Sequence, residues 1–162
     1  MKRLTVAAGA AWCLCCCLAT CRAADTPAYP VAWEVTSGVQ SPESAYFDAA
    51  SGFVFVSNIG GGGPTGKDGD GYLSQLTLDG KVAAAKWITG LNAPKGIRCF
   101  GGRLWVSDID QLVGVDIQQG KIVERVAVPG AEFLNDVACD AQGAVYVSDM
   151  TKNRIHRYHE GK

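Results

Sequence analysis

The chain has 162 residues, of which 19% are charged and 48% are hydrophobic. From residue 25 onward it carries 12 basic and 16 acidic residues, a net charge of −4. The basic side chains are scattered rather than clustered, so the charge pattern disfavours a nucleic-acid partner.

The first 24 residues have the pattern of a secretory signal peptide. Lys2 and Arg3 form a short basic segment, residues 4–18 are mostly apolar, and small residues precede Asp25. The apolar stretch is shorter than the roughly 20 residues that a membrane-spanning helix needs. We therefore predict an exported protein, periplasmic or secreted, with no transmembrane span.

The positions of the cysteines and histidines limit the lipid anchors, disulfides and zinc sites that the chain could have. Five of the seven cysteines lie in the leader, where Cys21 ends a sequence that approximates the lipobox of bacterial lipoproteins. Lipid anchoring at Cys21 is thus a less favoured alternative to cleavage and release. Cys99 and Cys139 remain, too few for a disulfide scaffold, and we expect two buried free thiols. His156 and His159 have no partner cysteines, which argues against a zinc site there.

After a lead-in over residues 25–41, for which an outer strand is one option, an internal repeat organises the chain. Each repeat contains an apolar strand, a turn with glycine, and a second strand with an aromatic residue that ends in Ser followed by Asp or Asn. The three endings are Ser57-Asn58, Ser107-Asp108 and Ser148-Asp149. Their spacing of 50 and then 41 residues matches the four-stranded blades of a β-propeller. Because the Ser-Asp pairs recur without a partnered His, we interpret them as turn and blade-packing devices rather than catalytic groups.

The predicted fold class is all-β, with antiparallel four-stranded blades at about residues 42–90, 91–130 and 131–162. No long segment shows a helical period. Propellers close with about 4 to 8 blades, whereas this chain offers two full blades and three strands of a third. We expect a fragment of a six-bladed propeller, with a homodimer that completes the ring as the less favoured alternative.

A glycine-rich insertion, Gly60 to Gly71, is expected to lengthen the loop between the second and third strands of the first blade. Within it, the segment from Gly61 to Lys67 has the G-x-x-x-x-G-K spacing of a phosphate-binding loop. Asp68 follows where Ser or Thr is required, and no helix can start at the next residues, so we predict no nucleotide binding. Calcium binding through Asp68 and Asp70 is disfavoured relative to a flexible surface loop, because the ligand ladder of an EF-hand is missing.

Three segments at the starts of the repeats are distinctive: Pro42-Glu43-Ser44, Gly90 to Gly96, and Phe133 to Val137. They resemble the gluconolactonase, regucalcin and senescence-marker-protein family of six-bladed propellers. The resemblance extends over about Ser41 to Tyr158, which is nearly all of the chain after the leader but only half of such a propeller.

The repeat alignment puts Glu43, Lys95 and Asn135 at equivalent positions, just before the innermost strand of each blade, where side chains crowd the mouth of a propeller's channel. In the resembled lactonases a glutamate and an asparagine bind one divalent cation, so the resemblance implies Glu43 and Asn135 as metal ligands. The cation would be Ca, Mg, Mn or Zn, and hard oxygen ligands favour the first three. It would polarise a lactone carbonyl and acidify an attacking water. Lys95 and Asn92 are the expected substrate contacts.

The departures from that family are equally informative. Its aspartate, a third ligand and general base, comes from a blade that this chain does not contain, so no catalytic base is assigned. Lys95 also places a positive charge beside the expected cation. Two readings stay open: a divalent-metal-dependent lactone or ester hydrolase when full length, and a non-catalytic propeller that binds a small molecule, peptide or envelope partner at the channel mouth. For Glu43 and Asn135 the alternative is that they only cap turns between blades.

Overall fold

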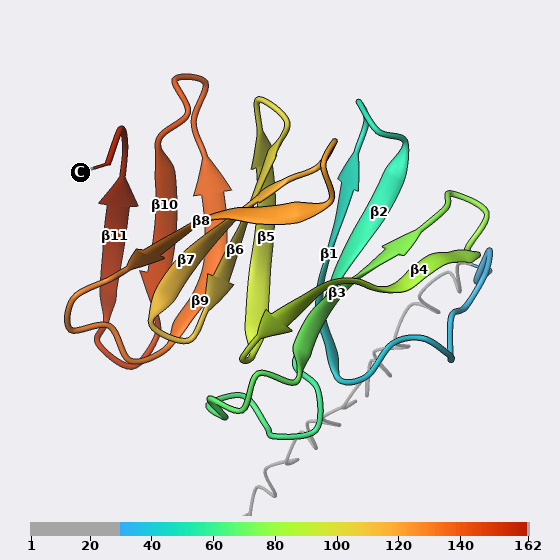
Figure 1. Cartoon of the computed structure of the whole chain (residues 1–162), viewed down its shortest axis with the longest axis horizontal. Helices are drawn as coiled ribbons and strands as arrows, with labels where there is room; N and C mark the ends of the chain where they lie inside the picture. Colours follow the sequence, from blue (N-terminus) through green and yellow to red (C-terminus); the bar gives the residue numbers. More distant parts are fainter. Residues whose placement is uncertain (1–29, 162) are drawn as a thin grey trace, which may run out of the picture. The chain divides into compact units, whose positions relative to one another are not determined.

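The chain divides into two units, residues 1–30 and 31–162, and the computed structural model describes residues 30–161 (Figure 1). The predicted signal peptide and Cys21 lie outside the described residues. Inside them the regular structure is entirely β-strand, and no helix suited to crossing a membrane occurs there. The all-β prediction is confirmed.

Eleven strands form three antiparallel sheets, each strand pairing with its neighbours in the sequence. Blade 1 contains β1 (Pro42–Asp48), β2 (Phe53–Asn58), β3 (Gly71–Leu76) and β4 (Val82–Leu91). Blade 2 contains β5 (Pro94–Phe100), β6 (Arg103–Asp108), β7 (Gln111–Asp116) and β8 (Lys121–Ala127). Blade 3 contains β9 (Leu134–Cys139), β10 (Val145–Asp149) and β11 (Arg154–Tyr158). These are two complete propeller blades and three strands of a third, as the repeat predicts.

Burial follows the position of a strand in its blade. The middle strands β6 and β7 are buried along nearly their whole length, because both faces of blade 2 are covered. The outer strand β8 instead alternates exposed and half-buried residues, the pattern of a strand with one covered face. The β5–β6 turn contains Gly101 and Gly102, both with positive φ, a backbone conformation that glycine adopts without a steric penalty.

Apolar side chains between the blades form two clusters. The first joins blades 1 and 2 and contains Phe55, Leu73, Ile88, Leu91, Ile97, Leu104, Val106, Val113 and Val115. The second joins blades 2 and 3 and contains Trp105, Leu112, Leu134, Val137, Val145 and Val147. Blade 2 therefore takes part in both clusters, and burial of these side chains holds successive blades together.

The serines of the repeat connect one blade to the next at the innermost strands. Ser57 Oγ accepts a hydrogen bond from the Ser44 amide of its own blade and donates to the Lys95 carbonyl of blade 2, 2.7 Å away. Ser107 Oγ accepts from the Gly96 amide and donates to the Asn135 carbonyl of blade 3. Each serine thus satisfies a backbone group on both sides of a junction between blades.

The residue after each serine holds the chain as it enters its own blade. The buried Asp108 carboxylate accepts hydrogen bonds from the amides of Asn92 and Ala93, just before β5. Asp149 does the same for the amides of Glu132 and Phe133, before β9. The hydrogen bonds confirm that the recurring Ser-Asp pair is a packing device.

Residues 30–41 form no strand, so the optional outer strand of the lead-in is absent from this range. The segment contacts blade 1 through separate hydrogen bonds to side chains and backbone groups rather than as a strand of the sheet. The Gln40 amide donates to Asn58 Oδ1, and Ser74 Oγ donates to the Gly38 carbonyl. Its hydrogen-bonding groups are therefore partly used without a β-ladder.

Candidate functional site

The predicted site residues lie at one end of the innermost strands. Glu43, Lys95 and Asn135 are each the second residue of their strand, in β1, β5 and β9. They thus lie inside the strands rather than just before them, which corrects the expected position by one or two residues. Figure 1 shows that these three strands run in the same direction and begin at the end of the unit where the loop between β2 and β3 lies. We call this end the channel mouth.

Glu43 is an exposed residue at the channel mouth. Its surroundings still desolvate the carboxyl in part, which raises its pKa above the ordinary 4.5. The positive charge of Lys95 acts in the opposite direction, and the negative charge of Asp136 raises the pKa further. Within residues 30–161 the Glu43 carboxylate takes part in no hydrogen bond or ion pair, so its oxygens are available to a ligand.

Lys95 is buried, with 1% of its surface exposed. Its amine donates hydrogen bonds to the carbonyls of Pro64 and Ala93, each 2.9 Å away, and lies 4.5 Å from the centre of the Phe133 ring. Burial lowers the pKa of this amine, while the charges of Asp108 and Glu43 oppose the shift. Lys95 thus anchors the loop that contains Pro64, and its role as a substrate contact stays a prediction.

Asn135 and Asn92 are both half-buried, but they have different surroundings. The backbone carbonyl of Asn135 accepts the hydrogen bond from Ser107. The side-chain amide of Asn135 has no hydrogen bond among the described residues. Asn92 lies in the connection between β4 and β5, and its backbone amide donates to both carboxylate oxygens of Asp108 at 3.1 Å. Asn92 is thus fixed by its backbone as part of a turn.

Asp136 was missed by the sequence reasoning. It is exposed, follows Asn135 directly, and its charge influences the pKa of Glu43 across the mouth. The repeat alignment holds a signal for it, because Asp136 is the acidic member of a position that is Ser44 in blade 1 and Gly96 in blade 2. The mouth therefore presents two carboxylates and one amide.

These groups have the chemistry of a site for a hard cation, since carboxylate and amide oxygens are the donors that Ca²⁺, Mg²⁺ and Mn²⁺ prefer. They do not complete one. Among residues 30–161 there is no group of three His, Cys, Asp or Glu side chains that could hold a metal ion. The described residues therefore fit only part of the ligand set that the family resemblance implies.

The glycine-rich loop over residues 59–70 is folded onto its own acidic side chains. The Asp70 carboxylate accepts a hydrogen bond from the Gly61 amide at 2.7 Å. A Cβ atom added to Gly66 would lie 2.7 Å from the backbone oxygen of Gly62, so the close approach of these two backbone segments requires glycine at residue 66. Lys67 forms an exposed ion pair with Asp110 of blade 2, with 2.6 Å between Nζ and Oδ2. The lysine of the phosphate-loop-like spacing thus connects the loop to the neighbouring blade.

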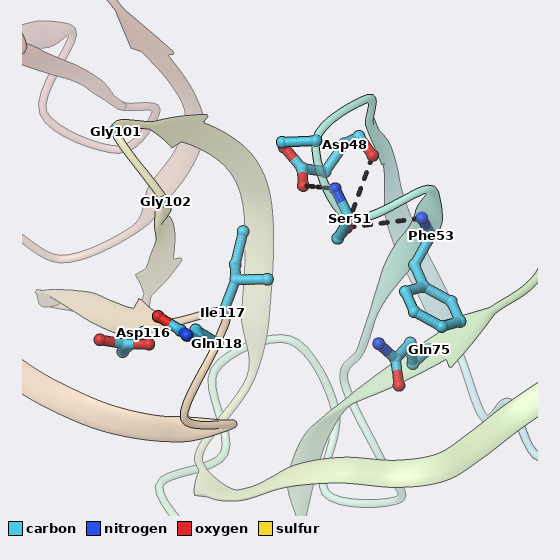
Figure 2. A pocket seen from close by; sticks show the side chains of 10 residues that line it. Asp48, Ser51, Phe53, Gln75, Gly101, Gly102, Asp116, Ile117 and Gln118 are labelled. Atoms are coloured by element: carbon cyan, nitrogen blue, oxygen red, sulfur yellow. Dashed lines mark hydrogen bonds between the residues drawn. The ribbon is translucent and has the colours of Figure 1, made fainter.

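A cleft lies between blades 1 and 2, at the end that is opposite to the channel mouth (Figure 2). This cleft of about 440 Å³ is lined on one side by Asp48, Ser51 and Phe53, and on the other by Gly102 and Asp116. Asp48 accepts a hydrogen bond from the Ser51 amide at 2.8 Å, and Asp116 holds the β7–β8 turn through Gln119. Both carboxylates accept hydrogen bonds within turns, whereas the Glu43 carboxylate at the channel mouth accepts none among residues 30–161.

Cys99 and Cys139 are unbridged and half-buried, more exposed than the predicted buried thiols. Partial burial raises the pKa of Cys99 to about 11, and the charge of Asp48 adds to the effect. Burial also raises the pKa of Cys139, against the charge of Arg98. Both groups are therefore poor nucleophiles at neutral pH.

Comparison with known proteins supports the fold alone. No protein-family model matches the chain, and no curated protein matches it. Among solved structures, Kuenenia stuttgartiensis hydrazine synthase is similar, with a TM-score of 0.50 and 16% identity over 83% of this chain and 40% of that chain. A catalytically inactive virginiamycin B lyase from Staphylococcus aureus with quinupristin has a TM-score of 0.49 and 15% identity, over 80% of this chain and 56% of that chain. The chain thus spans less than two thirds of either.

Proposed function

We propose that these blades supply part of a divalent-cation site at the channel mouth of an exported propeller that hydrolyses lactones or esters. One observation carries the proposal. Glu43 and Asn135, the two ligands implied by the family resemblance, are each the second residue of the innermost strand of their blade and lie at the same end of the unit. Neither side chain is used in a hydrogen bond among residues 30–161.

Each group at the mouth has a distinct part in this proposal. Glu43 and Asn135 would hold the cation, and Asp136 adds negative charge that attracts it. When bound, such an ion polarises a carbonyl and lowers the pKa of water. Lys95 forms no ion pair with Glu43, because its amine is bonded to the carbonyls of Pro64 and Ala93, but its positive charge opposes a cation at Glu43. We assign it the role of positioning the loop beside the mouth.

The direct test is cation binding by the full chain, measured by calorimetry with Ca²⁺, Mg²⁺ and Mn²⁺ in turn. Glu43→Gln keeps the shape of the side chain and removes its charge, so we expect affinity to fall about tenfold or more, equivalent to about 1.4 kcal/mol. Glu34→Gln removes the same charge from an exposed residue of the lead-in and should leave binding unchanged. Equal binding by the two variants would contradict the proposal.

The pH dependence gives an independent check. A cation binds the ionised form of Glu43, whose pKa is raised above 4.5. Binding should therefore weaken as the pH falls through this raised pKa, and begin to do so at a higher pH than for an ordinary glutamate. Titrations between pH 7 and pH 4 would show the shift, and the loss should be smaller in Glu43→Gln.

A non-catalytic binding protein is the second candidate, favoured by the incomplete ligand set among residues 30–161. In that case the open polar groups at the mouth would bind a small polar molecule, a peptide or an envelope partner directly. An assay of δ- and γ-lactone hydrolysis, in which the release of acid is measured with and without cation, separates the two functions. Cation binding without hydrolysis in an assembly with a closed ring would favour the second.

A further inference from the structure

The junctions between blades are built from two complementary halves. The first half lies on the second strand of a blade, where an aromatic side chain and a serine face the next blade. These pairs are Phe55 with Ser57 and Trp105 with Ser107. Phe55 is fully buried and Trp105 is 5% exposed, because the next blade covers them.

The second half lies on the innermost strand of the following blade. The serine hydroxyl binds the carbonyl of the second residue, which is Lys95 in β5 and Asn135 in β9. Side chains two and four residues further on pack into the same junction: Ile97 and Cys99 in the first cluster, Val137 and Cys139 in the second.

A third copy of the first half is present on blade 3, on the face away from blade 2. Tyr146 and Ser148 occupy the positions of Trp105 and Ser107. Ser148 Oγ accepts a hydrogen bond from the Asp136 amide at 3.0 Å, but it donates none to another group among residues 30–161. The two side chains line a shallow hollow of about 160 Å³ together with Ala138 and Ile155, and Ile155 is 69% exposed.

A further copy of the second half is present on blade 1. By the repeat register, Glu43 corresponds to Lys95 and Asn135, so its carbonyl is the equivalent acceptor. Ala45 and Phe47 correspond to the packing residues two and four positions further on. Both are exposed, Phe47 to 47%. Residues 30–161 therefore contain both halves of the repeating interface, and no other part of this range covers either half.

We propose that a second copy of this chain docks its β1 strand on the Tyr146–Ser148 face of blade 3. Ser148 Oγ then donates to the Glu43 carbonyl of the second copy, and Phe47 of that copy covers the apolar hollow. The contact continues the two junctions already present within the chain. It is head-to-tail, and two copies supply six blades, a number within the 4 to 8 with which propellers close.

Docking also adds to the channel mouth, and this consequence rests on the proposed function. Glu43 of the second copy arrives next to Asn135 and Asp136, at the place that a following innermost strand takes in the repeat. Docking thus adds a third carboxylate to the two carboxylates and one amide that a single chain presents at its mouth, and a divalent cation suits this donor set. Ca²⁺ or Mn²⁺ should therefore strengthen the association of the two copies.

The test is sedimentation velocity of the full chain over a concentration series, with circular dichroism as a check of folding. We expect the unaltered chain to form dimers. Phe47→Glu and Ile155→Glu each place a charge in the proposed contact and should raise the dissociation constant at least tenfold. Leu78→Glu changes a residue of similar exposure, 60%, in the β3–β4 turn and should dimerise normally.

Mixing the two variants tests the direction of the contact. Phe47→Glu keeps an intact blade 3 face, and Ile155→Glu keeps an intact blade 1 face, so the mixture should form heterodimers that neither variant forms with itself. A monomeric unaltered chain, or folded variants that dimerise normally, would overturn the proposal. Dimers that do not respond to cations would instead leave the docking intact and contradict the cation site.

Discussion

At the scale of single residues, the repeated Ser-Asp pair shows how a short motif can resemble a catalytic one while serving the fold. Ser107 is fully buried and bonded on two sides, to the Gly96 amide and the Asn135 carbonyl. Its hydroxyl is therefore not free to attack a substrate. Repetition along the chain was the signal that separated the structural role from the chemical one.

The Ser107 bridge predicts a measurable loss of stability. Ser107→Ala leaves a buried amide and a part-buried carbonyl without their partner, which should lower the free energy of unfolding by about 1–3 kcal/mol. Ser148→Ala is the matched control, because Ser148 has the same place in blade 3 but only the Asp136 amide as a partner. Urea denaturation at a concentration where the chain is monomeric compares them. An equal loss in both variants would contradict the bridging role.

How far the site could be predicted depended on the kind of residue. The repeat alignment was sufficient to place Glu43 and Asn135 on the same rung, because blades repeat their backbone geometry. It could not show that Lys95 points into the protein. The lysine amine binds the backbone carbonyls of Pro64 and Ala93, which lie in irregular segments whose path the repeat does not predict. The influence of Asp136 on Glu43 also required the arrangement of the innermost strands in space.

At the scale of elements, the loop over residues 59–70 is mostly exposed, as its glycines predicted, and it also has anchoring contacts that composition did not predict. Five of its glycines have a positive φ or a close neighbour, and Gly60 and Gly62 lie directly against the carboxylates of Asp70 and Asp68. The buried amine of Lys95 binds the loop from within, through the carbonyl of Pro64. Amino-acid composition indicates how flexible an isolated segment is, but it does not show an anchor such as Lys95, which belongs to another blade.

Removal of the buried anchor should loosen this loop. Lys95→Met keeps an apolar side chain of similar length and removes the amine, so amides of residues 61–69 should exchange with solvent several-fold faster. Lys67→Met removes only an exposed ion pair, of the kind that contributes about 0–1 kcal/mol, and should change the exchange much less. Hydrogen exchange with mass spectrometry measures both. Unchanged exchange in Lys95→Met would show that the loop is held by other contacts.

At the scale of the whole molecule, the strand pattern and the repeat interval were sufficient to predict the described architecture. The return of Ser followed by Asp or Asn after 50 and then 41 residues identifies the blades without any tertiary information. The path of residues 30–41 was not predictable in the same way. Its contacts include single hydrogen bonds to Asn58, Ser74 and the Leu78 carbonyl, which leave no periodic trace in the sequence.

The position of blade 2 between two apolar clusters predicts an order of local stability. Strands β6 and β7 are covered on both faces and should show the slowest hydrogen exchange, while β11, at the edge of blade 3, should exchange fastest. Amide exchange resolved by strand in dilute, monomeric protein tests this order. If β11 were protected as well as β7 under these conditions, the clusters would not be the main source of stability.

The two-sided serine junction has a consequence for how such a protein can grow. Every blade carries a donor on one face and the matching carbonyl on its innermost strand, so each unit is compatible with a copy of itself on either side. Duplication of one blade-length stretch of the gene would insert a unit whose junctions are already complementary. Blade number can then change by tandem duplication without new contacts having to evolve at the same time. Later substitutions can change the residues of each copy at the channel mouth separately.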